Sequence, residues 1–148
     1  MPIKSFKPSG KVRHGLMAAL SLSSDPISAS VQLEEGFEAS ILDNMVKISK
    51  LAQGTVVKVI GIDRATLSRH KKTHSKWHGA TATKVYNGAR VLDAALDLFN
   101  QDPQKAEQWL NTPAVALGGI SPSDYAKNPL GQEAVLDLIG RIKHGVMN

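Results

Sequence analysis

The feature that most constrains the fold is a run of apolar residues at intervals of three and four. They are Val85, Ala89, Leu92, Ala95, Leu96 and Phe99. This spacing places them on one face of an α-helix that starts near Lys84. Shorter runs with the same period occur within residues 12–20, 37–48 and 134–142. The pattern predicts an all-α fold, and the 85–99 stripe is either a dimer face or the internal core.

Capping signals divide the chain further. In the C-terminal half, helix starts are predicted at Asp102-Pro103, at Ser121 with Asp124, and at Asn128-Pro129. Ser49 is expected to cap a helix that ends near residue 60. The serines of residues 21–30 predict a loop, and Gly79 with its neighbouring threonines predicts a hinge. We therefore expect a basic arm and short helix at 1–33, a helix-turn-helix unit at 34–80, and a C-terminal helical domain at 81–148.

Positive charge is concentrated in one segment. The chain has a formal net charge of +5, yet residues 61–90 alone hold seven Lys and Arg against one Asp. Residues 91–148 hold four basic and seven acidic residues. This asymmetry favours a polyanionic partner for the middle of the chain and a different role for its C-terminal third.

The basic segment has the pattern of a DNA-binding helix-turn-helix. Gly61-Ile62-Asp63 is a tight-turn signal, and Asp63 can cap a helix that begins at Arg64. The β-branched residues 55–60 also suit a strand, but we choose a helix because the turn signal needs one before it. Six side chains would face DNA: Arg64, Thr66, Ser68, Arg69, Lys71 and Lys72. The alternative is a solvated cationic helix in a bundle.

Other chemistries find little support. His70, His74 and His78 have a spacing that can hold zinc, but no carboxylate or thiolate completes the set in this cationic segment. We predict no metal site and no cofactor. Asp93 and Asp97 share a helix face, which we interpret as solvated. No hydrolytic or phosphate-binding motif occurs, so we predict that the protein is not an enzyme.

The chain has no cysteine, which fits a reducing compartment. Its longest apolar runs are far shorter than the roughly 20 residues that cross a bilayer, and no export signal follows the basic start. We expect a cytoplasmic protein with no membrane partner.

The C-terminal third carries the most specific pattern. WLNTP at residues 109–113 leads to ALGGISPSD at 116–124, and GRIKHGV follows at 140–146. This resembles the Xre/MbcA/ParS antitoxin family, over roughly residues 35–148 and most specifically in the last forty. The segment YAKN at 125–128 departs from the family pattern, in which leucines are common there.

The resemblance implies a function. Members of that family are encoded beside a RES-domain toxin that depletes NAD, and they neutralise it by placing their C-terminal segment at its active-site entrance. Here that segment is Arg141, Lys143, His144, Gly145, Val146, Met147 and Asn148. Trp109 and residues 117–119 would form the scaffold that aims it.

The resemblance also implies repression of the protein's own promoter through the basic helix. A homodimer would set two such helices one DNA turn apart on a palindromic site. The main alternative is a stand-alone helix-turn-helix transcription regulator whose C-terminal domain senses a small ligand. A second is a structural adaptor that does not touch nucleic acid.

Overall fold

The protein is all-helical. The structure, a computed structural model, describes residues 15–145, which form nine α-helices, one short 3-10 helix and no strand. This confirms the predicted all-α fold. In chain order the helices are α1 (Leu16–Ala19), α2 (Pro26–Glu35), α3 (Ile41–Ser49), α4 (Gln53–Ile60), α5 (Arg64–Thr73), α6 (Gly79–Leu98), α7 (Pro103–Leu110), η1 (Val115–Leu117), α8 (Pro122–Tyr125) and α9 (Pro129–Lys143).

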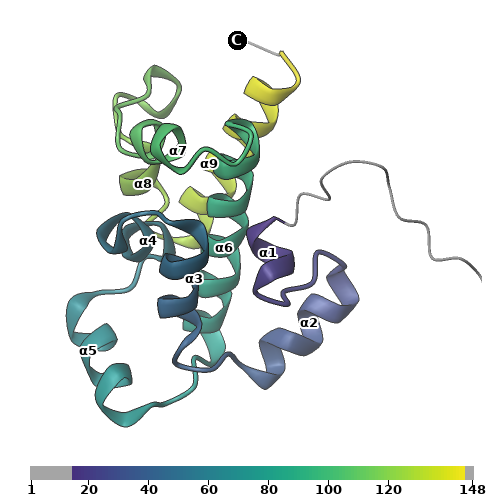
Figure 1. The fold of residues 1–148 in the computed structure, drawn as a ribbon, viewed down its shortest axis with the longest axis vertical. Helices are drawn as coiled ribbons and strands as arrows, with labels where there is room; N and C mark the ends of the chain where they lie inside the picture. Colours follow the sequence, from purple (N-terminus) through teal and green to yellow (C-terminus); the bar gives the residue numbers. More distant parts are fainter. Residues whose placement is uncertain (1–14, 146–148) are drawn as a thin grey trace, which may run out of the picture.

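Helix α6 is the central column of the fold (Figure 1). Helices α1, α2, α3, α4, α7 and α9 all pack against it. The predicted apolar stripe lies on α6, where it is buried among these helices, Phe99 being half-buried just past the helix end. The stripe is therefore the internal core, and the dimer-face alternative is wrong.

The predicted hinge at Gly79 is also wrong, because α6 begins there rather than at Lys84. Ala82, one turn further on, is fully buried. Packing of this first turn outweighs the weak helix propensity of glycine and threonine.

The predicted loop at residues 21–30 is confirmed only for residues 21–25, because α2 begins at Pro26. Asp25 is its N-cap and accepts a hydrogen bond from the Ser28 N–H at 2.9 Å, and Pro26 occupies the first helical position. Ala29 is the buried residue of this helix, while Ser28 and Ser30 face solvent. Ser28 and Ser30 therefore mark an exposed helix face, whereas the serines before Pro26 lie in the loop as predicted.

Ser49 does not cap α4, so that prediction is wrong. It ends α3, and its hydroxyl accepts from the Leu51 N–H at 3.1 Å. The hydrogen-bond donors at the N-terminus of α4 instead find their acceptor in a distant part of the chain. Glu107 Oε1 on α7 accepts from the Ala52 N–H at 3.1 Å and from the Thr55 hydroxyl at 2.9 Å.

Residues 55–60 lie in helix α4, as predicted. Val56, Val59 and Ile60 are fully buried in the core that α4 forms with α6. The two helices approach closely at Gly88, where an added Cβ would lie 2.7 Å from Ile60 Cγ1. Burial in this contact overrides the strand preference of β-branched residues.

The C-terminal helix starts are confirmed. Asp102 accepts from the backbone of Gln104 and Lys105, Ser121 from Asp124, and Asn128 from Gly131. These caps fix where α7, α8 and α9 begin. Of the helices in residues 15–145, none is both long and apolar enough to cross a membrane.

Candidate functional site

Helices α4 and α5 form a helix-turn-helix-like unit. Gly61 ends α4 with φ at 76°, and Ile62 is buried beneath the turn. Asp63 accepts a hydrogen bond from the Thr66 N–H at 2.7 Å, which caps α5 and lowers the pKa of the Asp63 carboxyl. The predicted turn and cap are confirmed.

The turn packs against the C-terminal half of the chain. A Cβ at Gly61 would lie 2.5 Å from the Lys127 carbonyl oxygen, so glycine lets the two backbones touch. Lys84 Nζ donates to the Gly61 carbonyl at 3.4 Å, and Lys58 pairs with Asp124 at 3.4 Å. The position of α5 thus depends on α6 and α8 as well as on α4.

Helix α5 has two different faces. At about 100° per residue, five of the six predicted DNA-contacting residues fall on the outer face, where all are exposed. They are Arg64, Ser68, Arg69, Lys71 and Lys72. None of the four cations among them forms an ion pair with a described carboxylate. Thr66, the sixth, is half-buried on the other side, and its hydroxyl accepts from Arg69 Nη2 at 3.3 Å.

The inner face of α5 rests on Trp77. The rings of His70 and Trp77 stack with centroids 3.6 Å apart and planes 12° apart. Trp77 is 1% exposed, and its backbone exchanges two hydrogen bonds with Phe37 at 3.0 and 2.8 Å. The sequence pattern did not predict this role, because Lys and His surround Trp77 and no apolar period passes through it. The one sequence feature that could have indicated this core role is a lone tryptophan within a cationic segment.

The three histidines spaced by four do not share a helix face. Helix α5 ends at Thr73, His74 takes a left-handed conformation with φ at 53°, and His78 is the N-cap of α6. His70 instead faces Trp77, with its Nδ1 atom 3.0 Å from the Ser75 carbonyl oxygen. Within residues 15–145, no three His, Asp or Glu side chains are grouped to hold a metal ion.

The predicted toxin-contacting residues begin at the end of α9. Arg141, Lys143, His144 and Gly145 are exposed, whereas Val146, Met147 and Asn148 lie outside the described residues. Lys143 pairs with Asp97 on α6. Arg141 and His144 form no ion pair with any residue in the described range.

Only part of the predicted scaffold lies beside the end of α9. Leu117 is buried and lines a groove of about 620 Å³ together with Arg141 and His144. Trp109 is half-buried, and its ring packs at a tilt against Phe99 with centroids 6.5 Å apart. The structure therefore brings Leu117, rather than the Trp109 ring, beside Arg141 and His144.

Asp93 is half-buried, so the prediction of a solvated face is wrong for it. Its Oδ1 atom accepts from the Met17 N–H at 3.3 Å, and the carboxylate lies against Gly15 at the start of α1. Burial raises the pKa of the Asp93 carboxyl. Asp97, one turn along α6, is exposed as predicted.

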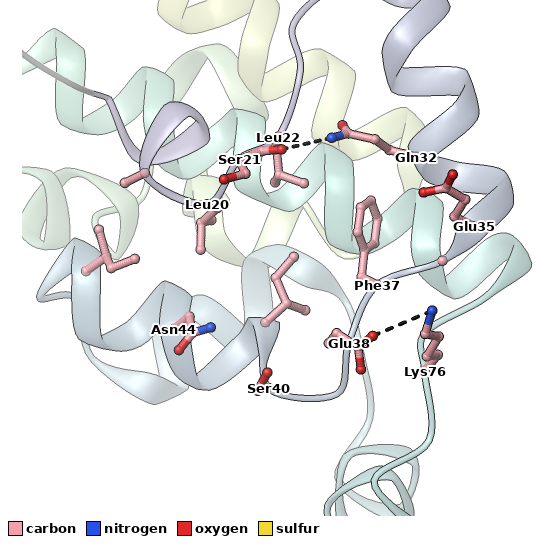
Figure 2. Close-up of a pocket in the computed structure, with 14 residues that line it drawn as sticks. Leu20, Ser21, Leu22, Gln32, Glu35, Phe37, Glu38, Ser40, Asn44 and Lys76 are labelled. Atoms are coloured by element: carbon pink, nitrogen blue, oxygen red, sulfur yellow. Dashed lines mark hydrogen bonds and ion pairs between the residues drawn. The ribbon is translucent and has the colours of Figure 1, made fainter.

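A second groove, of about 500 Å³, opens between α1, α2 and α3 (Figure 2). Phe37 and Leu22 line it with Glu35, and Lys76 pairs with Glu38 at its edge at 3.5 Å. This groove lies outside residues 81–148, where a ligand-sensing regulator of the kind considered above would bind its ligand.

Comparison with known proteins gives consistent matches. Residues 94–145 match the family model described as the antitoxin Xre/MbcA/ParS C-terminal toxin-binding domain. The chain is 31% identical over 149 residues to a protein named Antitoxin Xre from Photorhabdus laumondii subsp. laumondii, across 99% of this chain and 100% of that relative. It is 30% identical over 116 residues to an Antitoxin Xre from Yersinia enterocolitica, across 78% of each chain. The chain therefore belongs to the Xre/MbcA/ParS antitoxin family.

Proposed function

We propose that the protein is the antitoxin of a type II toxin–antitoxin pair and neutralises a RES-domain, NAD-degrading toxin by direct binding. The observation that carries this proposal is the similarity over 99% of the chain to a relative named Antitoxin Xre. The toxin-binding family match at residues 94–145 supports a toxin contact through this region. In this proposal the protein has no catalytic role of its own and acts by occupying its partner.

The C-terminal segment is the part that we propose blocks the active site. Helix α9 carries Arg141 and His144 to an exposed end, and Gly145, with φ at 70°, turns the chain out of the helix. The residues that follow include Val146 and Met147, whose apolar side chains suit a cleft, methionine being an adaptable contact residue.

Shortened chains test the block. Deletion of residues 146–148 leaves all the described helices intact, and deletion of 141–148 also removes the last turn of α9. We expect both to lose neutralisation, measured as growth and NAD content of cells that express the toxin, while promoter binding remains. Full neutralisation by the 141–148 deletion would contradict the proposed block.

We also propose that α5 binds the protein's own promoter. The support is the helix-turn-helix-like geometry, the five exposed polar residues on the outer face, and the four cations there that form no ion pair with a carboxylate of residues 15–145. Exposed cations without an ion-pair partner can neutralise phosphates. A homodimer would present two copies of α5 about 34 Å apart to a palindromic site. Its interface must lie elsewhere than on the buried stripe of α6.

Alanine variants test the DNA contact. Arg64→Ala or Arg69→Ala should weaken promoter binding by about 1–3 kcal/mol if the side chain reads a base, and by less if it meets phosphate. Lys105→Ala, at an exposed cation on α7, is the matched control and should bind as the wild type does. Titrations at low and high salt distinguish a contact with a base from a contact with phosphate, since phosphate contacts weaken with salt.

Two results would redirect the proposal. Absence of promoter binding even at low salt would remove the DNA role and leave an antitoxin that acts by protein contact alone. Promoter binding without any effect on the toxin would favour the stand-alone regulator.

A further inference from the structure

Three large apolar side chains of the C-terminal region are exposed: Ile120 and Leu130 beside one groove, and Val115 in the loop whose Ala116 and Leu117 line an adjoining groove. Val115 is 97% exposed, Leu130 84% and Ile120 45%. The 620 Å³ groove beside Arg141 adjoins a second groove of about 410 Å³, and Tyr125 and Ala134 line both. Ile120 and Leu130 line the second groove. Exposed apolar side chains grouped in one region beside grooves mark interaction sites more often than scattered apolar residues do.

The loop that carries Val115 is held in shape by its own backbone. The Ala114 N–H donates to the Ile120 carbonyl at 3.1 Å, and the Gly119 N–H donates to the Ala114 carbonyl at 2.9 Å. Gly118 and Gly119 take φ values of 69° and 83°, which favour glycine. Val115 is thus presented to solvent by an ordered turn, and little conformational entropy would be lost when a partner covers it.

We propose that Val115, Ile120, Leu130 and the two grooves form the surface on which the toxin docks, which we call the docking surface. This inference rests on the proposed antitoxin function and adds a contact separate from the tail. The docking surface lies wholly within residues 94–145, which match the toxin-binding family model. Its larger groove also reaches Arg141 and His144, so it is continuous with the root of the tail.

The lining indicates the chemistry of the partner. A toxin segment that fits would insert apolar side chains into the groove lined by Ile120 and Leu130 and would cover Val115 on the neighbouring loop. It would carry an acidic group toward Arg141, which has no ion-pair partner among the described residues. The docking surface would supply affinity, and the tail would supply the block.

Charge substitution tests the docking surface. Val115→Asp and Leu130→Asp alter side chains that contribute little to the core, so their melting temperatures should match the wild type. Ile27→Asp is the matched control, because Ile27 is 78% exposed but lies on α2, outside the matched segment. The probe is a catalytically inactive form of the RES-domain toxin proposed above as the partner.

We expect Kd for that probe to rise by about thirtyfold or more in each docking-surface variant, as for central apolar contacts of interfaces, and by less than about threefold in Ile27→Asp. The 146–148 deletion should still bind the probe, because it retains the docking surface. Unchanged Kd in both Asp variants, with tight binding by the wild type, would overturn the inference. A wild type that does not bind the probe would instead overturn the proposed function.

Light scattering tests whether a second copy of the chain, rather than the toxin, covers the docking surface. If wild-type protein is a dimer and the Asp variants are monomers with unchanged Kd for the toxin, then a second copy of the chain covers this surface and the inference is wrong.

Discussion

Replacing Trp77 with alanine would show what holds α5 to the rest of the protein. The indole is 1% exposed, stacks on His70 and belongs to the hydrophobic cluster around α6. Truncating a large buried aromatic side chain to alanine costs about 3–5 kcal/mol through lost burial and the cavity left behind. Trp77 Nε1 is buried without an acceptor in residues 15–145, so removing this donor offsets part of the cost. We therefore expect a loss near the lower limit, about 3 kcal/mol.

Thermal and urea unfolding measure this loss. For a chain of this size, 1 kcal/mol corresponds to about 2–4 °C in melting temperature, so Trp77→Ala should melt roughly 6–12 °C lower. Trp109→Ala is the matched control. Its indole is only half-buried, so we expect less than half the effect. Equal losses in the two variants, or a larger loss at Trp109, would refute the assignment of Trp77 to the core.

Hydrogen exchange then locates the effect. If the stack anchors α5, its amides should exchange faster in Trp77→Ala under native conditions, while the amides of α9 keep their protection relative to the variant's own global stability. Trp77→Phe keeps an aromatic ring beneath His70 and should restore most of the protection of α5. A uniform change across α5 and α9 would show that Trp77 acts only through global stability.

Two further predictions concern α6 and α9. Gly88→Ala should destabilise by about 1–3 kcal/mol through overpacking against Ile60, whereas Gly140→Ala, where a Cβ meets nothing within 4 Å, should stabilise by up to about 1 kcal/mol; urea unfolding of the pair decides, and a loss at both sites would contradict the contact. Burial raises the pKa of Asp93, so the folded protein holds this proton more tightly than the unfolded chain, and stability falls as pH rises through the interval just above 3.8. Asp93→Asn keeps an acceptor and removes the charge, so its stability relative to the wild type should rise over that interval; a difference independent of pH would contradict this reasoning.

Helix starts were predictable where a local signal acts alone. Asp102-Pro103 and Asn128-Pro129 each place a side-chain acceptor before the free N–H groups of a first turn, and both open helices. Asp25-Pro26 is the same signal, and it also opens a helix. The loop prediction was wrong from Pro26 onward because the cap at Asp25 outweighs the low helix propensity of Ser28 and Ser30.

Features that depend on distant contacts were not predictable from the pattern. The period on α6 predicts an apolar face but does not say which molecule covers it, and the neighbouring helices of the same chain do so. The stack of Trp77 under His70 requires the chain to fold back from Phe37, which no local signal encodes. The exposure of Val115 likewise depends on a turn closed by the Ala114–Ile120 pairing.

The two proposed binding surfaces meet at one short segment of backbone. The Lys127 carbonyl touches the helix-turn-helix at Gly61, and on its other side Lys127 lines the docking surface with Leu130. Ala126 between them is fully buried, so a toxin that displaced this segment would also move the turn that positions α5. The outer faces themselves lie apart, with α5 at one end of the molecule's longest axis and the end of α9 at the other (Figure 1). Changes to exposed side chains should therefore separate toxin binding from DNA binding, and changes to the shared backbone should alter both.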